Sequence, residues 1–202
     1  SGIPVQSGTK SFKNITDILK DTKYFEDTKP FIVHRLDKET SGLLLIAKNL
    51  NYAKKLSYLF KQKEITKYYI ALCEGNPKNN YSQVKLEIKN KKLKIENTLT
   101  NYKLLNKNKG ISSILFNPQT GKTHQLRIVS KNLGCPIVGD QKYNIHSKYS
   151  KEKLMLHAIA LKFELNTKKF EFISKLPDHF LSFVKKNDLK ISKDLKEYLN
   201  SF

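Results

Sequence analysis

The feature that most constrains the fold is a series of short apolar segments, each bounded by turn-forming polar residues. Most are four to eight residues long, which suits strands better than the helices of a globular protein. Several follow one another with only short polar links between them, as the strands of an antiparallel sheet do. The predicted strands cover residues 31–33, 43–47, 68–73, 82–88, 92–96, 99–105, 111–116, 154–163 and 169–173.

Helical periodicity also occurs, but it does not alternate regularly with the strands. In residues 51–63, for example, Ala53, Leu56, Leu59 and Phe60 fall on one helical face. This pattern favours an α+β domain, with a mixed and mostly antiparallel central sheet flanked by helices and loops, over a doubly wound parallel sheet. No repeat or linker divides the chain, so a single domain over residues 1–202 is predicted. The predicted helices cover residues 15–19, 51–63, 123–133, 177–186 and 192–199.

The chain carries a large excess of positive charge, with 38 Lys+Arg against 18 Asp+Glu and a formal charge of +20. Such a surface favours a polyanionic partner, most commonly nucleic acid. The alternative is compositional, because the chain is rich in Lys, Asn and Ile and many lysines are then merely solvated. No run of about 18 apolar residues occurs, so no membrane segment is predicted. Cys73 and Cys135 lack the spacing and the company of a metal site.

The segment His-Arg-Leu-Asp-Lys-Glu-Thr-Ser-Gly at residues 34–42 is the first that could carry chemistry. It places Asp37 and Arg35 on a turn between two predicted buried strands, where a rigid sheet can hold a reactive group. Asp37 could act as a nucleophile, a general base or a metal ligand. The alternative is an ordinary turn, in which Asp and Thr side chains satisfy backbone N–H groups.

A second segment, Thr-Gly-Lys-Thr-His-Gln-Leu-Arg at residues 120–127, is similar to a phosphate-binding loop. The upstream glycine of that motif is absent, since residue 116 is Phe, so the P-loop requirement fails. What remains is a loop entering a helix that carries Arg127. A buried arginine needs a carboxylate partner, and Asp37 is one candidate. For His124, a hydrogen-bonded structural role is favoured over a catalytic one.

The third segment is Lys-Tyr-Tyr-Ile-Ala at residues 67–71. Adjacent side chains of a strand face opposite ways, so only one of Tyr68 and Tyr69 can point into a given site. A tyrosine there could stack on a base and offer its hydroxyl for proton transfer. The alternative is two ordinary strand tyrosines.

Taken in this order, the segments resemble the RluA-type pseudouridine synthases, and most of all the branch that modifies bacterial large-subunit ribosomal RNA. The resemblance runs from Gly2 to about Phe180 and is strongest in the His-Arg-Leu-Asp and Thr-Ser-Gly block at residues 34–42. Two further blocks support it, Gly-Cys-Pro-Ile-Val-Gly-Asp at 134–140 and Leu-His-Ala at 156–158.

The resemblance implies roles for particular residues. Asp37 matches the catalytic aspartate, Tyr69 the tyrosine that packs against the target base, and Arg127 the basic residue that pairs with the aspartate. Arg35 matches the arginine that holds the place of the flipped-out nucleotide. Lys122 and His124 join Arg35 as candidates for RNA contact. The family fold is a mixed, mostly antiparallel α+β domain with a central cleft, and neither a metal nor an organic cofactor is implied.

The chain departs from the family pattern in two regions. Lys122 stands where an arginine is usual, which keeps the charge but loses the planar fork that grips phosphate. Val129 stands where a histidine is usual. We expect both to affect RNA contacts more than bond breaking. The first strand of the family and its small N-terminal S4-like domain are expected to be missing from this chain.

The resulting hypothesis is an enzyme that isomerises specific uridines in structured RNA, with 23S ribosomal RNA as the favoured substrate. The alternatives are the same activity on transfer RNA, a non-catalytic RNA-binding or ribosome-assembly protein, and a metal-dependent hydrolase using Asp37. We expect a monomer in the bacterial cytoplasm, with an organellar matrix as the alternative location. For Asp37, attack on the sugar and proton abstraction both stay open.

Overall fold

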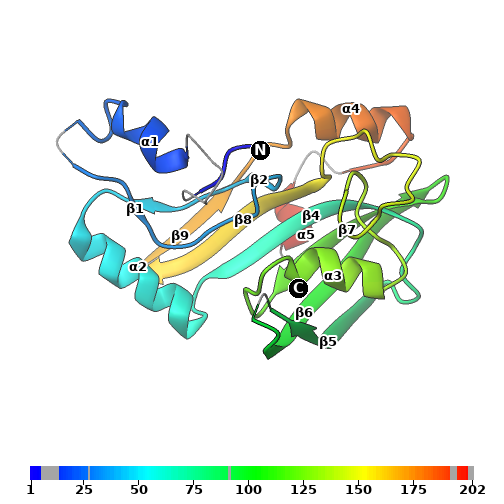
Figure 1. Cartoon of the computed structure of the whole chain (residues 1–202), viewed down its shortest axis with the longest axis horizontal. Coiled ribbons are helices and arrows are strands. Elements are labelled where there is room, and N and C mark those ends of the chain that lie inside the picture. The colour runs from blue at the N-terminus through cyan, green and yellow to red at the C-terminus, as the bar shows by residue number, and fades with distance from the viewer. Residues whose placement is uncertain (6–13, 27, 91, 192–194, 200–202) are drawn as a thin grey trace.

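The computed structural model describes residues 1–5, 14–26, 28–90, 92–191 and 195–199. Seven strands form the main sheet, in which β8 pairs with both β2 and β9. Only β2 and β8 run parallel, so the sheet is mixed and mostly antiparallel, and the predicted fold class is confirmed. The order is β2 (Ser41–Gly42), β8 (Leu156–Leu165), β4 (Thr66–Glu74), β7 (Ile111–Pro118), β6 (Ile95–Asn108) and β5 (Tyr81–Lys89), with β9 (Lys168–Ile173) on β8 (Figure 1).

The predicted strands at 92–96 and 99–105 are one continuous strand, β6, so their separation was wrong. The polar residues Asn97 and Thr98 do not form a turn, because they stay in register with Glu87 and Leu86 of β5. The chain reverses earlier, where the Asn90 side chain accepts hydrogen bonds from the backbone N–H groups that follow it. Polar side chains therefore lie inside a strand that continues past them.

The segment around the predicted turn at 37–42 forms less strand than expected. Phe31–Ile32 (β1) and Ile46–Ala47 (β3) pair in a separate two-stranded sheet, while β2 joins the main sheet through β8. Gly42 makes this possible: it has φ +110°, and a Cβ there would lie 2.2 Å from the carbonyl oxygen of Ala158. Only glycine allows the two backbones to approach so closely. The turn that carries Asp37 is thereby attached to β8 of the main sheet.

Five helices lie beside these strands in the described residues. Helix α2 (Leu50–Gln62) buries Ala53, Leu56 and Leu59 in a small core that includes Leu161 and Phe163 of β8. The larger core lies against α3 and α4. None of the described helices is long and apolar enough to cross a membrane. The others are α1 (Ile15–Lys20), α3 (Gln125–Asn132), α4 (Asp178–Lys186) and α5 (Leu195–Leu199).

The predicted helices are present, and in the first four the ends differ from the prediction by at most two residues. Helix α3 begins at Gln125 rather than at residue 123, because His124 has a left-handed backbone with φ 55°. Of the helix predicted at 192–199, residues 195–199 are helical, and 192–194 lie outside the described residues.

Candidate active site

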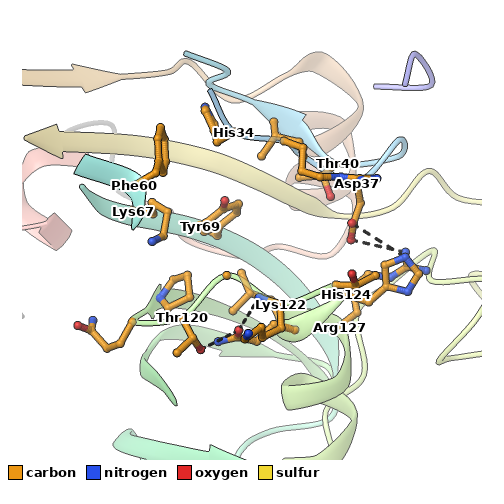
Figure 2. A pocket seen from close by; sticks show the side chains of 18 of the residues that line it. His34, Asp37, Thr40, Phe60, Lys67, Tyr69, Thr120, Lys122, His124 and Arg127 are labelled. Atoms are coloured by element: carbon orange, nitrogen blue, oxygen red, sulfur yellow. Dashed lines mark hydrogen bonds and ion pairs between the residues drawn. The ribbon is translucent and has the colours of Figure 1, made fainter. Parts of the chain in front are cut away.

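A pocket of about 580 Å³ opens between the turn after β1 and the loop that precedes α3. It lies at one end of β4, whose side chains form its floor (Figure 2). Pockets of this size hold a nucleoside-sized ligand. Every residue singled out for chemistry from the sequence lines it: Arg35, Asp37, Tyr69, Lys122, His124 and Arg127.

Asp37 begins the turn that ends at Thr40, whose backbone N–H donates to the Asp37 carbonyl oxygen over 2.9 Å. The turn is supported from behind by Ser41, whose hydroxyl lies 2.8 Å from Nδ1 of the buried His157. Nε2 of the same ring lies 3.1 Å from the hydroxyl of Ser174. Burial, followed by the charge of His179, lowers the pKa of His157 to about 4, so the ring is neutral near pH 7. Asp37 is thus fixed in its backbone while its side chain stays partly exposed.

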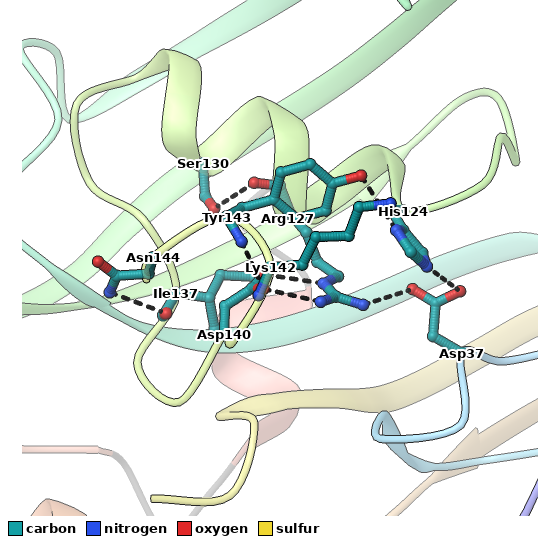
Figure 3. A network of polar contacts seen from close by, with 9 residues as sticks. All are labelled: Asp37, His124, Arg127, Ser130, Ile137, Asp140, Lys142, Tyr143 and Asn144. Atoms are coloured by element: carbon teal, nitrogen blue, oxygen red, sulfur yellow. Dashed lines mark hydrogen bonds and ion pairs between the residues drawn. The ribbon is translucent and has the colours of Figure 1, made fainter. Parts of the chain in front are cut away.

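The carboxylate of Asp37 faces two basic side chains without a short hydrogen bond to either. Its Oδ2 lies 3.9 Å from Nη1 of Arg127, and its Oδ1 lies 4.0 Å from Nε2 of His124 (Figure 3). Both separations exceed hydrogen-bonding distance, so Asp37 interacts with the Arg127 guanidinium by electrostatic attraction alone. The Asp37 oxygens are therefore available for new bonds.

Arg127 makes its shortest contacts with a second carboxylate, Asp140, in addition to the predicted ion pair with Asp37. The guanidinium donates from Nε and Nη2 to the two Asp140 oxygens over 2.8 Å and 2.7 Å. Burial works to lower the pKa of Arg127, but the hydrogen bonds and charge of Asp140 and the charge of Asp37 raise it overall. Arg127 is a buried, permanently charged group shared between two carboxylates.

Asp140 is the better satisfied of these carboxylates. Besides Arg127, the backbone N–H groups of Lys142 and Tyr143 each donate to it over 3.0 Å. Burial tends to raise the pKa of Asp140, but these hydrogen bonds outweigh it and the pKa lies below its ordinary value. The sequence-based interpretation treated Asp140 only as part of a motif block and missed this role.

His124 connects the Asp37 carboxylate to the loop that follows Asp140. Its Nδ1 lies 3.0 Å from the hydroxyl of Tyr143, and the two rings meet edge to face. Burial lowers the pKa of His124 more than the nearby Asp37 charge raises it. The ring is therefore neutral near pH 7, and its contact with Asp37 is not an ion pair there.

Tyr69 and Tyr68 face opposite sides of β4, as strand geometry requires. Tyr69 lines the pocket together with Asp37, whereas Tyr68 lies under the ammonium of Lys162 on the other face. Burial, followed by the charge of Asp37, raises the pKa of Tyr69 well above its ordinary value. Tyr69 is therefore a neutral phenol at physiological pH, which suits stacking and hydrogen bonding and does not favour it as a free base.

The buried side chain of Gln125 fixes the conformation of the loop before α3. Gln125 Oε1 accepts from the Thr120 hydroxyl and from the Lys122 backbone N–H, over 2.8 Å and 3.0 Å. Its amide nitrogen donates to the Leu99 carbonyl and the Thr100 hydroxyl on β6. Residue 125 was not singled out for this role from the sequence, although a glutamine on the first turn of a buried helix end is a usable signal.

The two remaining cations differ in their surroundings. Lys122 donates to Glu96 of β6 over 3.1 Å, and both side chains are partly exposed. Arg35 is exposed at the edge of the pocket and makes no ion pair in the described part of the chain. The Arg35 side chain is therefore free to contact a substrate, whereas Lys122 must first break its weak ion pair with Glu96.

His34 precedes Arg35 and was not predicted to have a role of its own. Its Nε2 accepts a hydrogen bond of 2.8 Å from the backbone N–H of Leu45, and its ring stacks on Phe60 of α2 with centroids 4.4 Å apart. Burial, followed by the charge of Lys67, lowers the pKa of His34 to about 4. The neutral ring connects the segment that carries Asp37 to α2.

Within the ranges that the structure describes, no group of three His, Cys, Asp or Glu side chains is arranged to hold a metal ion. Cys73 and Cys135 are buried and unpaired, and burial raises the pKa of Cys135 to about 12. Both are inert thiols in the core.

Comparison with known proteins places this arrangement in a family context. The family model for RNA pseudouridylate synthase matches residues 1–132. An uncharacterized RNA pseudouridine synthase of Zymomonas mobilis is 36% identical over 80% of this chain and 79% of its own length. The ribosomal large subunit pseudouridine synthase C of Rickettsia felis is 41% identical over 89% of this chain, and the match spans 64% of that relative's length.

Solved structures agree with the fold. The human RNA Pseudouridylate Synthase Domain Containing 4 superimposes with a TM-score of 0.83 at 25% sequence identity. The superposition covers 95% of this chain and 88% of the human one.

Proposed function

The chain belongs to the RNA pseudouridylate synthase family, and on that premise we propose that it isomerises specific uridines in structured RNA to pseudouridine. The observation that carries this proposal is the position of Asp37. It lies in a nucleoside-sized pocket, beside the buried cation Arg127, and in the same pocket as Tyr69. A purely RNA-binding protein has no need of this arrangement.

The reaction breaks the N1–C1′ bond of uridine, turns the base and rejoins it to C1′ through C5. In one route Asp37 attacks C1′, and the electrons of the N1–C1′ bond leave with the base. In the other, Asp37 takes the proton from C2′, and a glycal-like sugar forms as the base departs. Both need an ionised Asp37, and the guanidinium of Arg127 lies 3.9 Å from its carboxylate. We keep both routes in the proposal.

The other pocket residues position the nucleotide. The target base must leave its stack, which costs a few kcal/mol. Tyr69 offers a neutral aromatic face on which the base can stack, and the exposed Arg35 is free to fill the space that the base leaves. Lys122 and His124 also line the pocket, and in this proposal they contact the sugar-phosphate chain.

The proposed substrate is ribosomal RNA of the large subunit, because several relatives are named for that activity. The charge of +20 supports an RNA partner through phosphate contacts. We further propose a monomer that acts in the bacterial cytoplasm, where such RNA is found.

The test incubates the full chain with transcripts of 23S ribosomal RNA and of transfer RNA and then maps pseudouridine chemically. The proposal expects new pseudouridines in 23S RNA, with a chelator present or absent, and none with Asp37→Asn. Modification of transfer RNA alone would change the proposed substrate from ribosomal RNA to transfer RNA. Binding without any pseudouridine would favour the assembly-factor alternative, and a chelator-sensitive strand cut would favour the hydrolase.

A further inference from the structure

The end of the pocket away from Asp37 contains a cation that no acidic group neutralises. Lys67 of β4 lines the pocket there with Phe60 and His34, and it is partly buried. Among the described residues, no ion pair or hydrogen bond is found for its ammonium. Burial, followed by the charge of Lys63, lowers the pKa of Lys67. A partly buried ammonium beside a second ammonium is costly unless a ligand supplies an acceptor.

Lys67 lies on the same face of β4 as Tyr69, two residues away. At about 3.3 Å per residue the two side chains start about 6.6 Å apart along the strand. Figure 2 shows Lys67 and Asp37 on opposite sides of Tyr69. The pocket thus presents a carboxylate, an aromatic ring and an ammonium in that order.

This order matches the long axis of a uridine. A pyrimidine has its sugar at N1 and, across the ring, the group at C4. With the ribose at Asp37 and the ring on Tyr69, the C4 substituent points away from Asp37, toward Lys67. In uracil that substituent is a carbonyl oxygen, which accepts hydrogen bonds, and in cytosine it is an amino group, which donates them.

Building on the proposed function, we propose that Lys67 recognises the base of the target nucleotide by donating a hydrogen bond to O4 of uracil. The same bond assists the departure of the base. When the N1–C1′ bond breaks, its electron pair stays on the ring and spreads through C6 and C5 to O4. The hydrogen bond from an ammonium to O4 is therefore stronger for the departing base than for the bound uridine. An interaction that strengthens in the transition state lowers the barrier.

Two other roles for Lys67 make different predictions. A phosphate contact would appear in the salt dependence of RNA binding, at about one unit of slope per phosphate. A packing role would depend on the hydrocarbon stem of Lys67, which lines the pocket together with Phe60. Lys67→Met keeps the stem and removes the charge, and Lys67→Arg keeps the charge. Lys162→Met, on the neighbouring strand β8 and facing Tyr68, is the matched control.

The first measurement is binding of uridine and cytidine 5′-monophosphate, followed by NMR titration, and it does not depend on turnover. The wild-type chain should bind the uridine nucleotide about tenfold more tightly (about 1.4 kcal/mol), and Lys67→Met should bind both alike. The control should keep the wild-type preference. A wild-type chain that does not distinguish the two nucleotides overturns the role of Lys67, whether or not the chain makes pseudouridine.

The second measurement is turnover on the modified RNA. Lys67→Met should lower kcat about 100-fold, as removal of a single charge-stabilising donor does, with Lys67→Arg partly restoring it. RNA affinity and its salt slope should stay at the wild-type values. An unchanged kcat, or a salt slope that falls by one unit, contradicts the proposal.

The two readouts separate failure of this inference from failure of the proposed function. Nucleotide preference that depends on Lys67, in a chain that forms no pseudouridine in any RNA, would retain the recognition role and reject the isomerase. Unfolding of Lys67→Met is followed alongside, and removal of an unpaired, partly buried charge should leave the melting temperature equal or higher. Lys67 would be a structural residue if Lys67→Met lost much stability while Lys67→Arg restored only the wild-type stability and not the turnover.

Discussion

Two carboxylates approach the same guanidinium from opposite sides, and they are held very differently. Asp140 is fully buried, accepts two short hydrogen bonds from Arg127 and receives two more from the backbone of its own loop. Asp37 is partly exposed and comes no closer than 3.9 Å to Arg127. One arginine therefore serves a structural pair and a reactive one.

The difference shows how a carboxylate can lie beside a buried cation and still keep both of its oxygens unoccupied. A carboxylate that is fully hydrogen-bonded is stable but has no free oxygen for a substrate. Asp140 accepts the short hydrogen bonds of the Arg127 guanidinium, and Asp37 interacts with the same guanidinium only through longer-range electrostatic attraction. Substitution of Asp37 should therefore affect mainly turnover, and substitution of Asp140 mainly stability.

The largest effect is expected from Asp37→Asn, which removes the nucleophile or base and leaves the packing intact. Pseudouridine formation should fall by at least about 10,000-fold, or about 5.5 kcal/mol. RNA affinity should stay within about tenfold, and the urea midpoint should not fall, since Asp37 makes no short side-chain hydrogen bond in the described structure. Residual turnover near the wild-type rate would reject the role of Asp37.

Asp140→Ala should act mainly on stability, because it leaves the Arg127 charge buried without its close partner. Loss of one member of a buried pair costs about 3–5 kcal/mol. Urea unfolding followed by circular dichroism measures this directly, with Asp37→Ala as the matched control. Equal losses in the two variants would show that the carboxylates are not held differently.

Acidification should loosen the Asp37 turn before the Asp140 loop. His157 supports the turn with a pKa of about 4 in the folded chain against 6.5 when unfolded. The unfolded chain thus binds the extra proton first, so stability is complete above pH 6.5 and is lost as pH falls through 4, by up to about 3 kcal/mol. The Asp140 pKa is lowered below 3.8, so its contribution is lost only as pH falls further.

Hydrogen exchange over that range measures the difference. The amide of Leu43, which donates to Ala158, should lose protection at higher pH than the amide of Asn144, which donates to Asp140. His157→Gln should remove most of the pH dependence of protection at the Leu43 amide. The pKa of His34 is also about 4, so part of the pH dependence of global stability should remain. Loss of protection at both amides over one pH range would mean that the two regions open together.

The smallest effect is expected from Lys122→Ala. Its pair with Glu96 is partly exposed, so stability should change by less than about 1 kcal/mol. If Lys122 also contacts a phosphate, the salt slope of RNA binding should fall by about one unit. Fluorescence anisotropy at several salt concentrations tests this, with Lys109→Ala, whose exposed pair with Asp188 lies outside the pocket lining, as control.

Local patterns predicted the parts of the site that depend on neighbouring residues. Alternation along a strand correctly separated Tyr69 from Tyr68, and the residue types around 37 and 127 indicated the elements that meet in the pocket. The second and closer partner of Arg127, Asp140, was not predicted, because residue order does not rank two carboxylates that approach it from different loops. The merged strand β6 was missed for a similar reason, since pairing with β5 overrides the polar character of Asn97 and Thr98.

The parallel pairing of Ser41 and Gly42 with His157 and Ala158 joins segments more than 110 residues apart. Contacts this distant in sequence form late in folding, because a long loop must close before they stabilise anything. On a translating ribosome, the segment at 156–158 must leave the exit tunnel before the turn at 37–40 can take its final shape. The chain therefore gains its reactive geometry only after most of it has been synthesised, and a truncated nascent product lacks it.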